Sequence, residues 1–376
     1  LFVVAVALAL DLGVFHRQAH EVKMKEAVGW SAVWVTLGLA FSVVVYFAYQ
    51  GRWLGLGLDT PVYSTPEAVK QGADLIVRGA VSGREAAEQY LAGYVVEKSL
   101  AMDNIFVIAM IFGYFAVPAK YQHRVLFWGI IGALLMRGGM ILLGGEAVVR
   151  YQWVLILFGL FLVLTALKMA LIKGSGDVGS NPVVRLARRL FPTVDFYDGE
   201  RFLTRRTVKP AYSTDPATGR EVMEPPLPPP AGGLSAKRAA TPLLLALILV
   251  EFTDLVFAVD SIPAVFAVTP DPFIVFTSNI FAVLGLRSLY FCLAALIARF
   301  RFLKPALILI LAFVGVKLLL LSVPPYIDDV ARWFGAAVEE GTPIKIGTGV
   351  SLLAVAGTLG TAVALSWLLP GKGVKA

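Results

Sequence analysis

Acidic residues recur with the same spacing in two apolar segments that are each long enough to cross a membrane. Glu97 and Asp103 lie six residues apart in EKSLAMDNIF, and Asp254 and Asp260 have the same separation in DLVFAVDSIP. Ionisable side chains inside a bilayer are rare, costly and commonly functional. The repetition indicates that the same acidic motif occurs twice in this chain.

The candidate ligands in the two segments are all oxygen atoms. They belong to Glu97, Asp103, Asn104, Glu251, Asp254 and Asp260. Hard divalent cations such as Mg²⁺, Ca²⁺ and Mn²⁺ prefer oxygen ligands, whereas softer metals prefer thiolate or imidazole. In an unbroken helix, residues six apart point about 120° away from each other. The paired acids therefore either flank a break, which Pro263 would allow, or mark two steps of a pathway.

Basic residues repeat in the apolar segments that follow. Arg137 and Arg287 come 34 and 27 residues after the second acid of each pair, and Lys168 and Lys317 come 31 and 30 residues after the arginines. An unpaired charge at the centre of a membrane helix costs roughly 2.5–3.5 kcal/mol. We therefore expect the arginines to face the carboxylates as counter-charges. The lysines lie near the ends of their segments, where snorkelling to the interface explains them equally well.

The composition places these residues in a helical membrane protein. Of 376 residues, 58% are hydrophobic and 16% are charged, whereas a soluble globular domain carries about a quarter charged residues. Stretches of roughly 20 apolar residues, the length of a transmembrane helix, lie near 1–15, 29–49, 91–116, 125–145, 151–172, 241–268, 274–298, 304–323 and 346–369. Because the chain begins with Leu1, the first stretch is expected to be cut short. The sequence predicts an all-α, polytopic membrane protein with about nine transmembrane helices.

The repeated charges divide the chain into parts. The three expected spans of 91–172 match the three of 241–323, and an offset of three helices makes the two copies cross the membrane in opposite directions. Such a 3+3 inverted repeat is typical of secondary transporters and places a shared site near the bilayer midplane. The other parts are two spans with an extracytoplasmic loop at 1–90, a basic and Pro-rich cytoplasmic loop at 173–240, and a loop, last span and tail at 324–376.

Loop charges predict the orientation. The loops on one side of the expected spans carry 21 Lys and Arg, and those on the other side carry 7. By the positive-inside rule, the N-terminus lies outside and the C-terminus in the cytoplasm, in the inner (plasma) membrane. The loop at 173–240 contains RLARRLFP, typical of a short amphipathic helix, VDFYDGERFLTRRTV, which predicts a small hairpin, and PPLPPP, typical of a stiff tether. We attribute its charge to topology and attraction to anionic lipid, and expect no nucleic-acid partner.

The acidic regions resemble those of a known family. EKSLAMDNIFV and TPLLLALILVEFTDLVFAVDSIPAVFAV are similar to the two signature regions of the TerC/Alx family of bacterial integral membrane proteins, named for tellurium resistance. The similarity extends in weaker form over most of 28–323, and the segments at 50–90 and 173–240 are less typical. The resemblance implies an inner-membrane protein related to LysE-type transporters, with manganese export as its activity and the five carboxylates as its functional residues.

Three hypotheses of function follow. The first is an exporter of divalent cations, Mn²⁺ foremost, with midplane carboxylates, proton exchange and no permanently bound cofactor. The alternative is a membrane scaffold in a metal- or tellurite-stress complex, whose protein partners the sequence does not identify. The third is an intramembrane aspartyl protease, but its GxGD motif is absent, because Asp103 follows Ala-Met and Asp260 follows Ala-Val. We therefore expect no enzyme.

Overall fold

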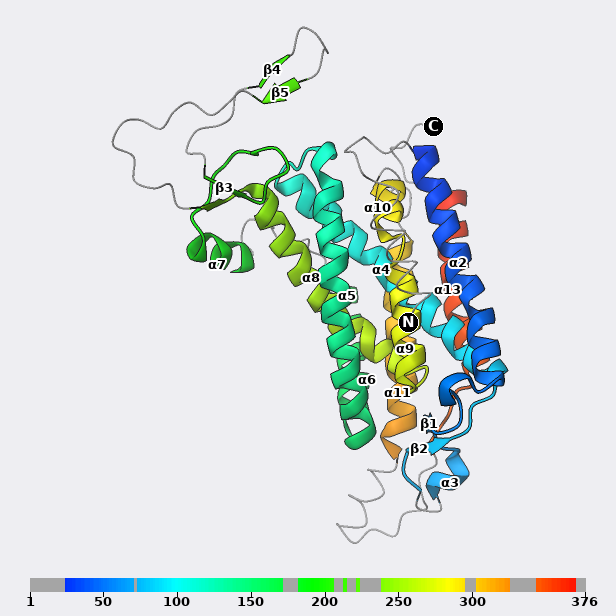
Figure 1. Ribbon diagram of the computed structural model, residues 1–376. Coiled ribbons are helices and arrows are strands. Elements are labelled where there is room, and N and C mark those ends of the chain that lie inside the picture. Colours follow the sequence, from blue (N-terminus) through cyan, green and yellow to red (C-terminus); the bar gives the residue numbers. More distant parts are fainter. Residues whose placement is uncertain are drawn as a thin grey trace.

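The computed structural model is a bundle of long helices with small β-structures at its two ends (Figure 1). The structure describes residues 24–70, 73–171, 182–205, 212–214, 221–223, 238–294, 302–324 and 343–369. The span expected near 1–15 and the Pro-rich stretch at 225–230 lie outside these described residues.

Each expected span within the described residues corresponds to a long helical segment. These are α2 (Met24–Gln50), α4 (Gly83–Tyr114), α5 (Ala119–Arg150), α6 (Val154–Leu171), α8 (Pro242–Phe266), α9 (Pro272–Val283) with α10 (Leu286–Ala294), α11 (Leu303–Ser322) and α13 (Thr348–Leu368). Within the described part, seven segments are long and apolar enough to cross a membrane, and α4 is long enough but more highly charged. A polytopic, all-helical membrane protein is thus confirmed. The total of nine spans and the inverted repeat stay predictions.

Local sequence signals set the helix ends. α4 begins eight residues before the expected span at 91–116, because the Ser82 side chain accepts a hydrogen bond from the Glu85 amide, a capping arrangement that supports a polar first turn. α8 begins with Pro242 in its first turn, where the missing N–H costs nothing. Asp271 caps α9 by accepting from the Phe273 amide at 2.9 Å.

The span expected near 274–298 is broken between α9 and α10. Gly285 there has a φ of 73°, a left-handed conformation that glycine adopts without steric penalty. A Cβ at this position would lie 2.5 Å from the Cβ of Trp34 on α2. The sequence marked Pro263 as a possible break. It lies instead within the last turn of a continuous α8, and only three residues of the helix follow it. The break therefore falls two residues before Arg287.

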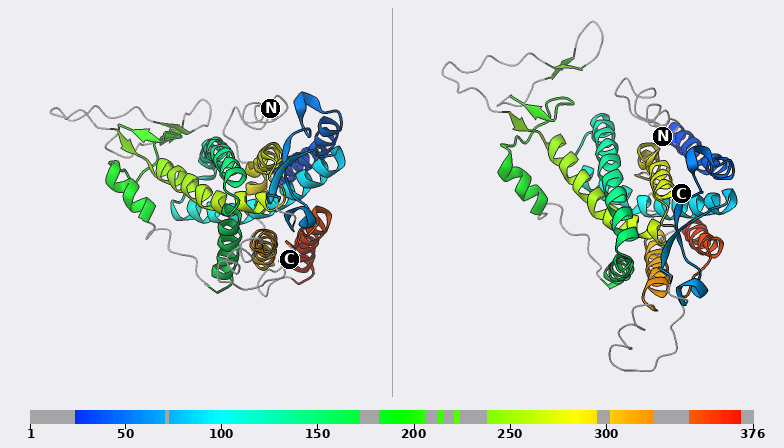
Figure 2. Two further views of the ribbon diagram at one scale, coloured as in Figure 1. Left: turned by 90° about the horizontal axis from the view of Figure 1, so that it is seen from below. Right: turned by 60° about the horizontal axis from the view of Figure 1, so that its bottom comes forward.

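α4 and α8 cross in the middle of the bundle (Figure 2). α5 packs chiefly on α8, α9 packs chiefly on α4, and α6 packs on α11. The second helix of each expected half thus packs on the first helix of the other half. α2 and α13 also contact α4. This exchange of partners brings the acidic segments of α4 and α8 together.

Short elements cover the ends of the bundle. β1 (Thr60–Tyr63) pairs antiparallel with β2 (Ile76–Gly79), and α3 (Pro66–Lys70) lies between them. The Tyr63 hydroxyl donates to the Phe266 carbonyl at the end of α8 at 2.5 Å. Lys345 donates to the Tyr63 carbonyl at 2.9 Å, and burial lowers the pKa of Lys345. This hairpin is thus fastened to the end of α8 and to the segment before α13.

The loop between the two halves has its own structure. It forms α7 (Pro182–Leu190) and the antiparallel pairs β3 (Leu203–Thr204) with β6 (Ala239–Ala240) and β4 (Tyr212–Thr214) with β5 (Glu221–Met223). The short helix that the sequence predicts at RLARRLFP is present as α7. The hairpin predicted at VDFYDGERFLTRRTV is not found among the described residues, because β3 in that stretch pairs with β6, and the β4–β5 hairpin lies beyond it. The Tyr197 hydroxyl donates to the Phe115 carbonyl at the end of α4 at 2.6 Å, and burial raises the pKa of Tyr197 to about 12.

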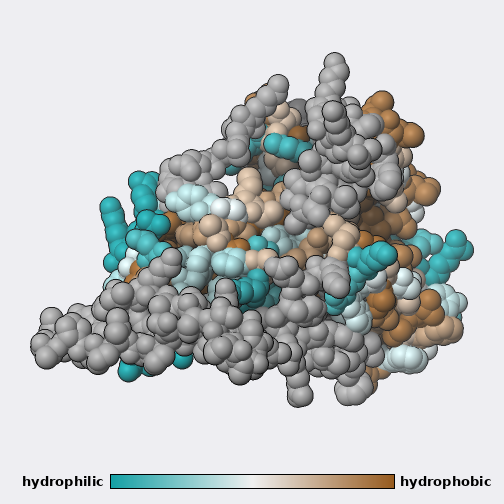
Figure 3. All heavy atoms as spheres, turned by 90° about the horizontal axis from the view of Figure 1, so that it is seen from above, coloured by the Kyte–Doolittle hydropathy of each residue, from teal (hydrophilic) through white to brown (hydrophobic). Residues whose placement is uncertain are grey.

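Large apolar side chains cover the outer faces of the bundle. Phe47 on α2, Leu164 on α6 and Leu353 on α13 are 55%, 52% and 75% exposed. From above, hydrophobic side chains gather on the right-hand side, where α2 and α13 lie (Figure 3). A soluble monomer rarely exposes so much contiguous apolar surface. These faces are suited to contact with lipid.

Candidate functional site

Arg137 lies at the centre of the bundle and holds two carboxylates from different halves of the chain. Only 2% of this residue is exposed. Its Nε and Nη2 donate to the two oxygens of Asp254 at 3.1 and 2.9 Å, and its Nη1 donates to Glu97. A planar guanidinium suits such a two-pronged contact with a carboxylate. The structure thus brings together three of the predicted site residues.

Two polar side chains complete this central cluster in a reciprocal manner. Asn104 Nδ2 of α4 donates to Asp254 Oδ1 of α8 at 2.6 Å. Ser261 Oγ of α8 lies 3.4 Å from Arg137 Nη1 and interacts with Glu97 of α4. The residue that follows the second acid of each pair (Asn104 after Asp103, Ser261 after Asp260) therefore reaches the first acid of the other pair. These contacts also show that α4 and α8 run antiparallel where they cross.

The cluster lies halfway along its helices. Asp254 is the middle residue of α8, and Glu97 and Arg137 lie near the middle of α4 and α5, which have 32 residues each. A helix of this length spans the hydrocarbon core of a bilayer. The cluster therefore lies near the midpoint of three long helices.

Three buried oxygens in and beside the central cluster have no hydrogen-bond partner among the described residues. They are Glu97 Oε2, Asn104 Oδ1 and Glu251 Oε2. A buried acceptor without a partner costs about 1–3 kcal/mol, so such atoms in native proteins commonly bind water or an ion. The central cluster offers free oxygen ligands in addition to those that Arg137 holds.

Glu251 extends the cluster toward the start of α8. It is half-buried and lies close enough to Asp254 for the two charges to interact. A Cβ at Gly132 of α5 would lie 2.0 Å from Glu251 Oε1, so the absent side chain of this glycine provides the space for the carboxylate. From Glu251 to Ser261, oxygen atoms follow one side of α8 for roughly 15 Å, at 1.5 Å per residue.

Asp103 and Asp260 form a second pair outside the central cluster. Both are half-buried, and their charges are close enough to interact. Thr165 Oγ1 of α6 donates to Asp260 Oδ1 at 2.9 Å. The exposed side chains of Lys168 and Lys304 lie within electrostatic range of Asp260 and Asp103 respectively. Sequence reasoning assigned no role to Lys304.

The six predicted ligands thus divide between two places. In the described part of the chain, no three Asp, Glu, His or Cys side chains are close enough to hold one metal ion together. Since α4 is continuous from Gly83 to Tyr114, Glu97 and Asp103 necessarily face different neighbours. The first arrangement that the sequence allowed, an acid pair flanking a break, is therefore not present in α4.

Comparison with known proteins places the chain in a family. Residues 82–368 match the family described as "Integral membrane protein TerC family". The chain belongs to the TerC family. This confirms the resemblance given by the acidic segments, and the matched region contains all ten predicted site residues.

Relatives of this TerC-family chain carry names of two kinds. An uncharacterized membrane protein of Myxococcus xanthus is 40% identical over 369 residues, which cover 97% of this chain and 89% of that protein. The putative membrane-bound redox modulator Alx of Escherichia coli (strain K12) is 40% identical over 322 residues, or 85% of this chain and 84% of that protein. No solved structure matches the chain. The chain is thus similar to membrane proteins along most of their length.

The two arginines of this TerC-family chain occupy different surroundings. Arg287 is 4% exposed and lies within electrostatic range of His123, near the start of α5. His123 and Arg137 are roughly 20 Å apart along the axis of α5, at 1.5 Å per residue. The break at Gly285 and the shorter connection after Asp260 account for this difference. Counter-charge at the central carboxylates is supplied by Arg137.

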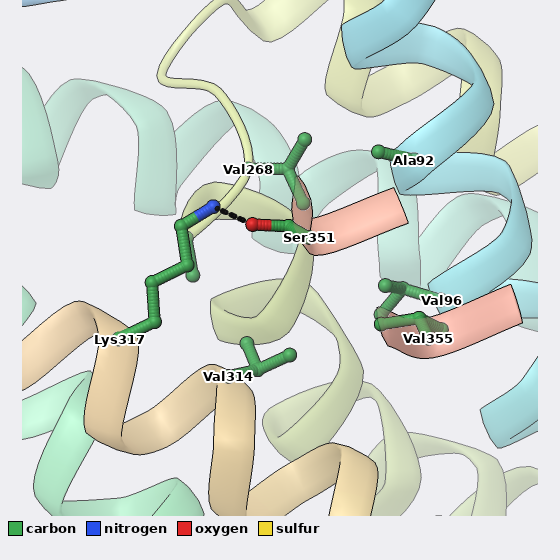
Figure 4. A pocket seen from close by; sticks show the side chains of 8 residues that line it. Ala92, Val96, Val268, Val314, Lys317, Ser351 and Val355 are labelled. Carbon is green, nitrogen blue, oxygen red and sulfur yellow. Dashed lines mark hydrogen bonds between the residues drawn. The ribbon is translucent and has the colours of Figure 1, made fainter. Parts of the chain in front are cut away.

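The two lysines also differ in their surroundings. Lys168 is exposed near the end of α6, whereas Lys317 of α11 is 6% exposed. Lys317 Nζ donates to Ser351 Oγ of α13 at 2.9 Å, beside a cavity of about 10 Å³ (Figure 4). The other residues that line it are small and apolar, including Val96 and Val314. Lys317 therefore links α11 to α13 rather than pairing with a carboxylate.

Lys98 has a place that sequence reasoning missed. It is 8% exposed, and its Nζ donates to the Ala282 and Leu284 carbonyls at 3.0 and 3.3 Å. These carbonyls lie at the end of α9, where the partial negative charge of a helix terminus favours a cation. The only sequence signal is a basic residue directly after Glu97 inside an apolar segment. Neighbouring residues of α4 thus contact both the central cluster and the broken helix.

Proposed function

We propose that this chain is a transporter that exports divalent cations, with Mn²⁺ as its main cargo. The observation that carries the proposal is the contact of Glu97 and Asp254 with one guanidinium in the bundle centre. When all three groups are charged, the cluster keeps one excess negative charge, and Glu251 adds another nearby. Buried negative charge and free oxygen atoms favour a hard cation as the ligand.

Arg137 and a divalent cation compete for the same oxygens in this proposal. A cation between the two carboxylates takes over the oxygens to which the guanidinium donates. Two carboxylates balance the charge of a divalent ion, whereas Arg137 balances only one of them. The guanidinium therefore closes the site when no cargo is bound and withdraws as the cargo enters.

The reciprocal contacts across the α4–α8 crossing support two inverted halves. Asn104 reaches Asp254, and Ser261 reaches Glu97, as a two-fold axis between the halves would require. Transporters built in this way open their midplane site to each side in turn. Asp103 and Asp260 then form a second binding site for the ion. Because carboxylates bind metal only when deprotonated, release of the cargo is coupled to proton uptake.

The names of the relatives suggest a role in redox balance. This chain has a single cysteine, Cys292, which has no second thiol in the chain with which to form a disulfide. We infer that any redox effect follows from the ion transported rather than from thiol chemistry. The alternative of a scaffold in a stress complex predicts that the phenotype depends on a partner protein and not on ion flux.

Reconstitution of the purified chain in proteoliposomes tests the proposal. Uptake of Mn²⁺, Ca²⁺, Mg²⁺ and Zn²⁺ is measured with and without a pH gradient. We expect Mn²⁺ flux that the gradient accelerates and that Asp254→Asn removes. Glu88→Gln is the control, because Glu88 lies on α4 with its side chain partly exposed and pairs with the exposed Arg84. Absence of metal flux in the wild-type chain would leave the scaffold as the better account.

A further inference from the structure

α7 is a nine-residue helix that is attached to the bundle by one face. Val184 and Ala187 are 3% and 5% exposed and belong to the same buried apolar cluster as Leu243 and Ala246. These two partners lie in the first turns of α8, which is long and apolar enough to cross a membrane. α7 is thus fixed beside the point where α8 begins.

A second face of α7 is apolar and uncovered. Leu186 and Leu190, four residues apart, are 56% and 66% exposed, and Phe191 directly after the helix is 42% exposed. Residues at this spacing lie on one side of a helix. They stand beside the covered face, so the apolar surface of α7 is wider than the part that α8 buries.

The third face of α7 is basic. Arg185, Arg188 and Arg189 are all exposed, and at 3.6 residues per turn they share one side of the helix. The helix contains no acidic residue. In Figure 1, α7 lies on the outer side of α8, and the side on which it lies carries hydrophilic side chains in Figure 3. The three arginines therefore form an exposed basic face on α7.

We propose that α7 is a docking surface for an anionic lipid leaflet. Leu186, Leu190 and Phe191 enter the acyl region, and the three arginines bind the phosphates of the headgroups. Three observations favour lipid over a protein partner. The apolar and basic faces are those of a helix that lies in the membrane interface, the charge is of one sign, and the attachment to the start of a span sets the helix at headgroup depth. The leaflet thereby anchors α8, which carries Asp254.

Fluorescence quenching on the full-length chain tests this proposal. Cys292→Ser is combined with Leu190→Cys, the new thiol is labelled with an environment-sensitive fluorophore, and the protein is reconstituted in phosphatidylcholine vesicles with or without phosphatidylglycerol. We expect lipids with a doxyl group on the acyl chain to quench the label severalfold more strongly than aqueous iodide, and phosphatidylglycerol to increase the difference. Adding Arg185→Gln, Arg188→Gln and Arg189→Gln should abolish the response to phosphatidylglycerol.

A label at Leu353→Cys, on the lipid-facing side of α13, is the matched control and should be quenched by doxyl lipid in both vesicles. Dominant iodide quenching at position 190 in both vesicles would place α7 in water and overturn the proposal. Protection from both quenchers would show that a second copy or another protein covers the helix. Equal doxyl quenching in both vesicles would reject the selectivity for anionic lipid.

Discussion

Asn104 of α4 donates a 2.6 Å hydrogen bond to Asp254 of α8, across 150 residues of sequence. The bond orients the carboxylate toward Arg137, and it leaves Asn104 Oδ1 without a partner among the described residues. The Asn104 side chain therefore positions the Asp254 carboxylate and also places an acceptor oxygen beside it. This arrangement makes the central cluster sensitive to changes in any one of its members.

Replacing Arg137 should change how transport depends on pH. Arg137→Gln leaves two buried carboxylates without their counter-charge, so protons neutralise them more readily and compete with the metal. We expect Mn²⁺ flux to fall and its optimum to move to higher pH. Arg137→Lys keeps the charge but loses the planar fork, and should restore flux only in part. Arg124→Gln, on the same helix but paired with the half-exposed Glu200, is the control. An unchanged pH profile in Arg137→Gln would reject the coupling.

Asp260→Asn and Asp254→Asn should have different effects if the central cluster and the Asp103–Asp260 pair are separate ion-binding sites. Asp254 lies in the central cluster, whereas Asp260 bonds Thr165 on α6. We expect Asp254→Asn to lose Mn²⁺ binding in titration calorimetry. Asp260→Asn and Asp103→Asn should retain at least one binding event while losing flux and metal tolerance in cells. Loss of all binding in each of the three variants would point to one joint site.

Gly132→Ala offers a test of Glu251 that leaves every charge in place. The added methyl would lie 2.0 Å from Glu251 Oε1, and the flexible carboxylate must move aside. We expect Mn²⁺ flux to fall severalfold while the melting temperature stays close to that of the wild type. Gly139→Ala, on the same helix with nothing within 4 Å of the new Cβ, should preserve both. Normal flux in Gly132→Ala would exclude Glu251 from the path.

The spans could be predicted from the sequence because a membrane helix needs roughly 20 predominantly apolar residues. The carboxylates could be predicted because charge is costly there. Which carboxylates meet could not be predicted, since the crossing of α4 and α8 depends on side chains distributed over the whole chain. The break at Gly285 was missed because a glycine is tolerated within a helical pattern. The place of Lys98 was missed because its partners are backbone carbonyls, which every residue carries.

The last prediction concerns this link between Lys98 and the broken helix. Lys98→Met keeps most of the side-chain volume but removes the donor to the Ala282 and Leu284 carbonyls. Leaving a buried acceptor unpartnered costs about 1–3 kcal/mol. We therefore expect a melting temperature several degrees lower in detergent and faster hydrogen exchange in α9 and α10.

Lys168→Met is the matched control, because Lys168 is exposed near the end of its helix and should change neither quantity. If the lysine acts only on the break, Lys98→Met retains Mn²⁺ binding at Glu97 and Asp254, since neither carboxylate is changed. Unchanged stability and exchange would show that the ammonium does not support the break. Loss of binding with unchanged stability would instead assign Lys98 to the ion path itself.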